Sequence, residues 1–191
     1  MIRRIEMIAP AAEKAKTMIY KKAVKAIKPI LLIIDMQPRY DASSNPELLN
    51  SIEYQIKIAK KCKYKIIVVE LHHYFKGKLH RLYTTRPRLL KKVKNYSQYQ
   101  LVNKTGADGS SEILVACEKR RWKPKKFIVT GIHSRFCVAA TVRGLLETCN
   151  AKIEIIENAC RDYGITKGPD PSGTWDMFQR KTRIKIRSGV E

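Results

Sequence analysis

The sequence predicts an α/β protein of three layers, in which a mostly parallel β-sheet lies between helices on both faces. Two observations predict this fold class. Short apolar runs alternate along the chain with segments whose apolar residues recur at the helical period, and no sequence repeat or low-complexity linker interrupts them. The runs are also continuously apolar, which is typical of parallel strands buried on both faces.

The N-terminal half predicts two strands and two helices. Residues 1–28 are basic with apolar residues near the helical period, so we expect an amphipathic helical extension that docks on a domain spanning 29–191. Glu6 and Glu13 within it are unusual for a targeting peptide. Pro29 ends this helix. The next elements are a strand "ILLIID" at 30–35, a helix opened by Pro46 at 46–62, and a strand "KIIVVEL" at 65–71.

The C-terminal half continues the alternation. A strand "QYQLVNK" precedes a helix that Ser110 or Ser111 can cap, and a strand "KFIVTG" precedes a helix that begins near Cys137. The final strand is "AKIEIIEN", followed by a weaker helical pattern. This order predicts a Rossmann-like sheet. The expected strands span 98–104, 126–131 and 151–158, and the expected helices span 111–122, 137–149 and 172–182.

Length, hydropathy and cysteine content limit the classes of protein. The 191 residues, 44% of them hydrophobic, suffice for one substantial core. The longest apolar run has the length of a strand, far below the roughly 20 residues that span a bilayer, so we expect no membrane span. The five cysteines are odd in number and widely spaced, without a C-x-x-C pair or a secretory signal. We therefore expect free thiols in the cytoplasm.

The formal charge of +22 leaves two interpretations open. Such a charge attracts nucleic acid or anionic substrates. The lysines are nevertheless scattered through nearly every segment, and no zinc-finger spacing or aromatic-interleaved RNA motif accompanies them. We favour a solvated compositional bias and keep nucleic acid as an alternative partner.

Chemically useful side chains follow the predicted strands. Asp35, Glu70 with His72, and Lys104 come at strand ends, and Cys137 follows a strand at the start of a helix. The carboxyl ends of parallel strands share one edge, where such folds place their chemistry. A helix N-terminus and a nearby lysine are expected to lower the pKa of the Cys137 thiol, and Asp35 could accept its proton. Taken singly, each residue also suits an ordinary structural role.

Four segments together resemble the isochorismatase-like cysteine hydrolase superfamily, which includes nicotinamidases and N-carbamoylsarcosine amidohydrolases. The resemblance covers about residues 29–165. The segments are "LLIIDMQPRY" at 31–40, "VNKTGADGSSEIL" at 102–114, "FIVTGIHSRFCVAATVRGLLE" at 127–147 and "IEIIENAC" at 153–160.

The resemblance implies a catalytic triad of Asp35 as general base and acid, Lys104 as the cation that stabilises the thiolate, and Cys137 as nucleophile. It also implies a non-proline cis peptide between Ile132 and His133, which would direct the His133 and Cys137 N–H groups at an oxyanion. The implied reaction is cleavage of an amide-type C–N bond of a small molecule through an acyl-enzyme. Relatives commonly assemble, so we expect a homo-oligomer.

Departures from the family pattern bear on the substrate and on metals. Tyr40 ends "DMQPRY", and Ser134–Arg135 stands where the family usually has Thr–Asp, so Tyr40, His72 and Arg135 are candidate pocket residues. Arg135 beside the thiol suits an anionic or strongly polar substrate. The metal pair of nicotinamidases, Asp-x-His, becomes Glu70 and His72 here, with His80 a further candidate ligand. We expect no cofactor, because the longer glutamate fits a zinc site built for aspartate poorly.

Two other functions remain as alternatives. The protein could be a basic scaffold that binds nucleic acid or directs assembly and only keeps the hydrolase fold. It could also be an isochorismatase in the strict sense, cleaving an ether without a covalent intermediate. Cys137 counts against the second alternative, because relatives with that activity generally lack the nucleophilic cysteine.

Overall fold

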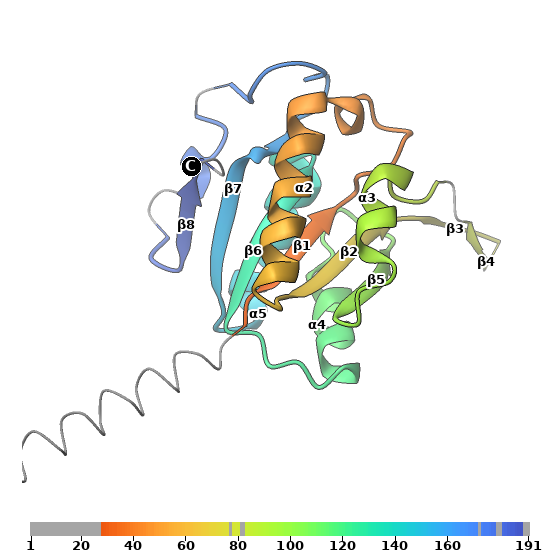
Figure 1. Ribbon diagram of the computed structural model, residues 1–191, viewed down its shortest axis with the longest axis vertical. Helices are drawn as coiled ribbons and strands as arrows, with labels where there is room; N and C mark the ends of the chain where they lie inside the picture. Colours follow the sequence, from red (N-terminus) through yellow and green to blue (C-terminus); the bar gives the residue numbers. More distant parts are fainter. Residues whose placement is uncertain (1–27, 77, 81–82, 172, 179–180, 189–191) are drawn as a thin grey trace, which may run out of the picture.

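A six-stranded parallel sheet forms the centre of the protein in the computed structural model, which describes residues 28–76, 78–80, 83–171, 173–178 and 181–188 (Figure 1). The strands are β1 (Ile30–Ile34), β2 (Lys65–Leu71), β5 (Tyr99–Lys104), β6 (Lys126–Ile132), β7 (Lys152–Arg161) and β8 (Ile184–Arg187). Their order is β5-β2-β1-β6-β7-β8, and every pairing is parallel. The predicted extension at residues 1–28 lies outside the described residues, apart from Lys28.

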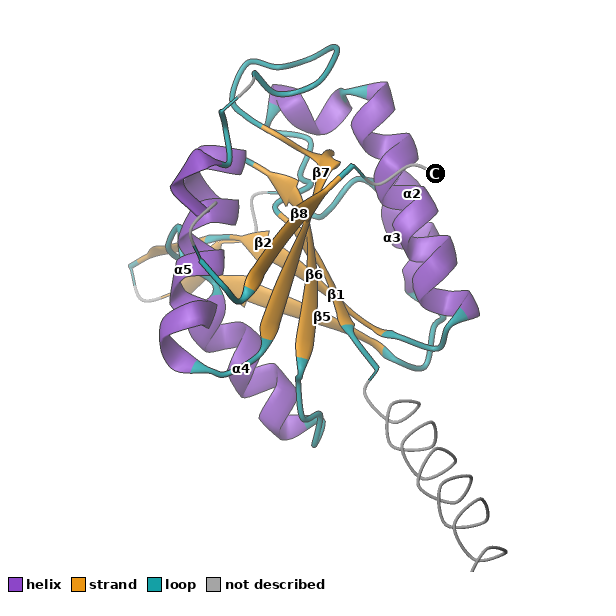
Figure 2. Cartoon of the chain, turned by 90° about the vertical axis from the view of Figure 1, so that its left-hand side faces the viewer, coloured by secondary structure: helices purple, strands orange, loops and turns teal. Residues whose placement is uncertain are grey.

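Helices cover both faces of this sheet, which confirms the predicted three-layer α/β class (Figure 2). The helices α2 (Pro46–Lys61) and α3 (Pro87–Val93) lie on one face, and α4 (Ser110–Lys119) and α5 (Ala139–Thr148) lie on the other. Leu31 and Ile33 of β1 pack in the hydrophobic core between the sheet and α2 and α3, whereas Leu32 and Ile34 pack in the core between the sheet and α4 and α5. Burial on both faces explains why β1 is continuously apolar. None of the helices in the described ranges is long and apolar enough to cross a membrane.

The strand order reverses between β1 and β6, and this switch point lies where the two strands end. Gly131 of β6 has φ +125°, and a Cβ atom there would come within 2.2 Å of the Ile34 carbonyl oxygen. Only glycine permits this approach of the two backbones. The residues that follow β1 and β6 are therefore held side by side, at the position where open α/β sheets bind ligands.

Two predicted helix starts differ from the structure. Gly109, not a serine, precedes α4, and the Asp108 side chain accepts a hydrogen bond from the Ser110 N–H at 2.7 Å. The helix expected from Cys137 begins earlier, as a π-helical turn at Ser134–Val138, and continues as α5. Cys137 therefore lies within an irregular turn rather than at the first residue of a regular helix.

The predicted helix at 172–182 is wrong, at least over the described part of that range. Only a 3-10 helix at Asp176–Phe178 forms there, and it follows Gly173, whose φ of +81° breaks a helical path. The sequence analysis also missed five elements. These are the 3-10 turn at Asp41–Ser44, the hairpin of β3 (His73–Phe75) and β4 (Lys78–His80), helix α3, and edge strand β8.

A cluster of ion pairs stabilises β8 at the edge of the sheet. Glu154 of β7 is 4% exposed, and it forms ion pairs with Lys126 of β6 and Arg187 of β8. Burial opposes ionisation, but the hydrogen bonds and charges of the two partners outweigh it and hold the pKa of Glu154 below its ordinary value. One carboxylate therefore links three consecutive strands.

We predict that Glu154→Gln lowers the free energy of unfolding by about 1 to 2 kcal/mol at neutral pH, because the amide loses both ion pairs and leaves two cations without their partner. The folded-state pKa is lowered, so this stabilisation is present above the ordinary value of 4.5 and disappears as the pH falls through the folded-state pKa. Urea unfolding of wild type and Glu154→Gln at pH 7 and at pH 3 measures this difference in the free energy of unfolding. An equal difference at both pH values would contradict this account.

Candidate active site

Asp35 directly follows β1 and is 1% exposed. Its N–H donates to the Val69 carbonyl at 2.9 Å, which extends the pairing of β1 with β2 by one residue. Its φ of 54° lies in the left-handed region, an uncommon conformation for a residue other than glycine. The chain thus leaves the strand sharply at this carboxylate.

Lys104 ends β5 and is completely buried beside Asp35. Its Nζ lies 2.9 Å from Oδ2 of Asp35 and donates a hydrogen bond to the Ala107 carbonyl at 2.7 Å. The aliphatic part of the Lys104 side chain packs closely on Gly109, where an added Cβ would lie 3.0 Å from Cδ of Lys104. Two opposite charges are therefore fixed against each other out of water.

Cys137 joins this pair from the π-helical turn after β6. Its thiol is half-buried and lies close enough to the Asp35 carboxylate and the Lys104 ammonium group for both to act on its pKa. The structure thus brings together the three residues that the sequence analysis singled out, from the ends of three separate strands. Their catalytic roles remain predictions.

The pKa of the Cys137 thiol is not lowered as expected from the sequence but raised, to about 11. Burial is the largest cause, and the Asp35 carboxylate adds to it, whereas the Lys104 charge only partly opposes both. Burial also raises the pKa of Asp35, against the effect of Lys104. The thiol is therefore neutral at rest, beside a carboxyl group that has a raised affinity for a proton.

Backbone and aromatic groups surround the thiol. The peptide bond between Ile132 and His133 is cis, and the His133 ring lies 5.1 Å from the ring of Tyr40 and 5.6 Å from that of Tyr163. Tyr163 is 75% exposed. The guanidinium of Arg39 lies 5.0 Å from the centre of the Tyr40 ring. Aromatic rings and a cation thus border the site.

Arg135 points toward a carboxylate, since its Nε lies 3.5 Å from Oδ2 of Asp162. Asp170 accepts a hydrogen bond from the Asp162 N–H at 2.7 Å and another from the Ser134 hydroxyl. These contacts tie the loop after β7 to the turn that carries Cys137. The sequence analysis missed Arg39, Asp162, Tyr163 and Asp170, because nothing local in the sequence places these loop residues at the site.

Gln37 is a further residue whose importance the sequence analysis did not recognise, although it lies in the quoted "DMQ" segment. It is completely buried, and its side chain exchanges hydrogen bonds of 3.0 Å with the backbone of Leu71. It also donates to the Tyr83 carbonyl at 2.7 Å. Gln37 thus fixes the segment after β1 to the end of β2.

The candidate metal ligands do not form a metal site among the described residues. Glu70 Oε2 lies 3.1 Å from His72 Nε2, and Glu70 Oε1 accepts a hydrogen bond from the Thr85 N–H at 2.6 Å. Only Nδ1 of His72 is left without a partner, whereas zinc takes at least three protein ligands. His80 lies opposite His73 in the β3–β4 hairpin. The pair of Glu70 and His72, both buried, therefore fits a structural contact better than a zinc ion.

Comparison with known families gives one match over most of the chain. A model of the isochorismatase domain family matches residues 29–168. No curated protein matches the sequence significantly.

Solved structures show the same fold at low sequence identity. An N-carbamoylsarcosine amidase from Thermoplasma acidophilum has a TM-score of 0.63 and 15% identity, over 86% of this chain and 98% of that one. A nicotinamidase/pyrazinamidase from Bacillus subtilis has a TM-score of 0.66 and 14% identity, over 85% and 100%. A MAR1 ribonuclease from Caenorhabditis elegans has a TM-score of 0.59 and 22% identity, over 85% and 77%.

We predict that alkylation of Cys137 by iodoacetamide is slow at neutral pH and increases with pH up to an inflection near about 11. Lys104→Met should move this inflection upward and Asp35→Asn downward, since an opposite or like charge in contact typically changes a pKa by about 1 to 3 units. Peptide mapping by mass spectrometry gives the rates.

The exposed Cys62 is the internal reference, and at pH 7 it should be labelled before Cys137. Circular dichroism checks that both variants stay folded. Saturated labelling of Cys137 at pH 7, or an inflection that neither substitution moves, would contradict the effect that we assign to burial and to the two charges.

Proposed function

The chain belongs to the isochorismatase family, and from this membership we propose that it is a cysteine hydrolase that cleaves an amide-type C–N bond of a small molecule. One observation carries the proposal. Asp35, Lys104 and Cys137 come from three distant segments and meet at the switch point of the sheet, where Asp35 and Lys104 are buried and Cys137 is half-buried. A nucleophile, a proton acceptor and a fixed cation in contact are the groups that acyl transfer needs.

In the first half of the reaction, Asp35 accepts the proton of the Cys137 thiol as sulfur attacks the carbonyl carbon of the substrate. Lys104 stabilises the negative charge that passes between carboxylate and sulfur. The tetrahedral oxyanion would be held by the His133 and Cys137 N–H groups. Asp35 then gives its proton to the leaving nitrogen, the C–N bond breaks, and a thioester remains on Cys137.

In the second half, a water molecule attacks the thioester while Asp35 accepts one of its protons. The C–S bond breaks, the carboxylic acid leaves, and the proton on Asp35 returns to the sulfur. The raised pKa of Asp35 supports this scheme, because burial makes its carboxylate a better proton acceptor than an exposed one.

The border of the site supports a polar or anionic substrate. Arg39 beside Tyr40 forms no ion pair with a carboxylate within the described ranges, whereas Arg135 is paired with Asp162. Arg39 is therefore the better candidate to contact an anionic group, which differs from the sequence-based expectation for Arg135. The rings of Tyr40 and Tyr163 both lie close to the ring of His133.

Two other reactions have less support. Ether cleavage of the isochorismatase type would leave Cys137 without a purpose beside Asp35 and Lys104. One of the similar structures is that of a ribonuclease, but a thioester intermediate forms at a carbonyl carbon and has no counterpart in phosphodiester hydrolysis.

The proposal is tested by intact-mass spectrometry after acid quenching, with a panel of small primary amides. We expect an adduct of the acyl mass on Cys137, absent from Cys137→Ser, and release of ammonia in solution. Asp35→Asn should slow turnover by at least about 10²-fold, because an amide cannot accept the thiol proton.

Cys62→Ser is the matched control, since it removes an exposed thiol outside the site and should keep both adduct and turnover. An adduct on another cysteine, or full activity in Cys137→Ser, would refute the covalent mechanism. Absence of any turnover across the panel would favour the scaffold alternative.

A further inference from the structure

The segments at one edge of the sheet carry many cations and no acidic residue. Six segments lead into the six strands, and all six lie at the edge of the sheet opposite Asp35 and Cys137 (Figure 1). We call this the amino edge. Its segments contain twelve lysines and arginines and no aspartate or glutamate. They are residues 28–29, 62–65, 94–98, 120–126, 149–152 and 181–183.

The opposite edge has a different composition. The segments that leave the strands there carry Asp35, Asp41, Asp108, Asp162 and Asp170. Acidic residues therefore occur in the chain but are absent from the amino edge. Cations occur at both edges, since Arg39, Arg135 and Lys167 lie in segments that leave the strands. A compositional bias therefore accounts for the cations, but it gives no reason for the absence of acids from the segments of the amino edge.

Most cations of the amino edge are free to contact a partner. Four are engaged: Lys126 pairs with Glu154, Arg183 donates to carbonyls at the end of α5, and Lys65 and Arg120 lie over the Trp122 ring. The other eight are exposed and form no ion pair with a carboxylate of the described residues. These are Lys28, Lys63, Lys94, Arg121, Lys123, Lys125, Lys152 and Lys181.

The spacing of these charges follows the sheet. One cation-bearing segment enters each strand, and neighbouring strands lie about 4.8 Å apart, so the charges form a row about 24 Å wide. In a duplex, the phosphates of one strand rise by about 3.4 Å each along the helix axis, so a width of about 24 Å corresponds to about seven phosphates of that strand. The width and the uniform sign therefore fit a phosphodiester backbone.

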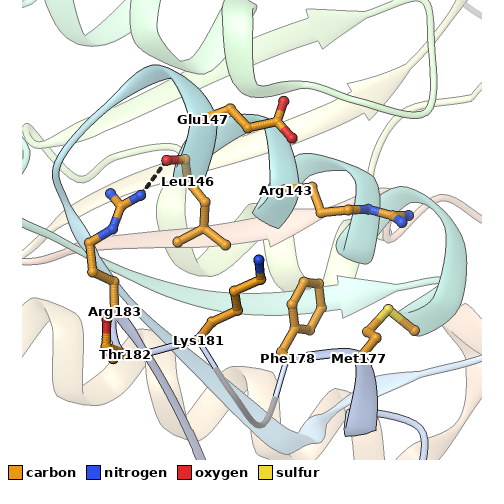
Figure 3. A pocket seen from close by; sticks show the side chains of 8 residues that line it. All are labelled: Arg143, Leu146, Glu147, Met177, Phe178, Lys181, Thr182 and Arg183. Atoms are coloured by element: carbon orange, nitrogen blue, oxygen red, sulfur yellow. Dashed lines mark hydrogen bonds between the residues drawn. The ribbon is translucent and has the colours of Figure 1, made fainter.

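A hollow extends the basic surface around the β8 end of this edge (Figure 3). It has a volume of about 400 Å³ and lies between α5 and residues 177–178 and 181–183. Arg143, Lys181 and Arg183 line it together with a single carboxylate, Glu147. Figure 3 shows the Lys181 side chain directed toward α5 between Leu146 and Phe178. Cations thus continue beyond the row of strand starts.

We infer that the amino edge binds the phosphodiester backbone of nucleic acid, without sequence preference, while the catalytic edge stays open. Membrane lipid is the poorer partner, because no large apolar side chain of these segments is exposed that could enter a bilayer. Among the exposed large apolar residues of the described chain, Met177 borders the hollow, and the others lie away from the amino edge. Binding here would add a second interaction to the proposed hydrolase without using its site.

The test is fluorescence anisotropy of a labelled oligouridine with the full chain, titrated between about 50 and 200 mM salt. Two triple variants each remove three exposed lysine charges. The edge variant carries Lys123→Gln, Lys125→Gln and Lys152→Gln, and the control variant carries Lys57→Gln, Lys167→Gln and Lys185→Gln. Circular dichroism confirms that both are folded.

For wild type we expect a log–log salt slope of about −3 to −5, at about −0.7 per phosphate contact. The edge variant should have a slope shallower by about 2 and at least about tenfold weaker binding at low salt, whereas the control variant should bind almost as wild type does. A DNA strand of the same length should bind similarly, since the backbone is the ligand.

Three results would overturn the inference. The first is no measurable binding at the lowest salt concentration. The second is an equal loss of affinity in the edge and control variants, which would show a response to net charge rather than to this surface. The third is tighter binding to anionic lipid vesicles than to the oligouridine, which would identify a membrane surface as the partner.

Discussion

The buried ion pair between Asp35 and Lys104 is the interaction on which the arrangement of the site depends. Either charge alone would be costly at this depth, because it would lose hydration without an opposite charge nearby. The two residues end β1 and β5, which are separated by β2 in the sheet. Backbone hydrogen bonds from Asp35 to Val69 and from His72 to Lys104 join both ends to β2. Three strand ends therefore have to be in register before the pair can form.

The same pair determines how the thiol can react. A cysteine activated by a helix N-terminus would carry a negative charge at rest and react with any electrophile that reaches it. Cys137 instead stays neutral, and its proton has one nearby acceptor. Sulfur then becomes nucleophilic as Asp35 accepts that proton, which ties reactivity to a substrate seated at the site. A neutral resting thiol is also less prone to oxidation.

The sequence predicted the sheet and the three clustered residues well, because both depend on local patterns. β1 is continuously apolar and Asp35 follows it directly, and Lys104 is the last residue of β5. The direction of the Cys137 pKa was predicted wrongly, because burial is set by segments far apart in the chain. Helix α3 has only seven residues, and β8 has only four, so the alternation in "IKIR" is too short to predict a strand. Arg39 and Tyr163 reach the site through loops, whose paths no periodicity encodes.

The absence of acids from the segments of the amino edge makes the two edges of the sheet differ in net charge. On a negatively charged support such as a cation-exchange bead, the amino edge would face the solid and the strand ends that carry Asp35 and Cys137 would face the liquid. Adsorption would then orient every molecule alike, with its reactive side accessible. The arrangement of charge around this sheet thus makes the protein suited to immobilisation without a tag or a chemical crosslink.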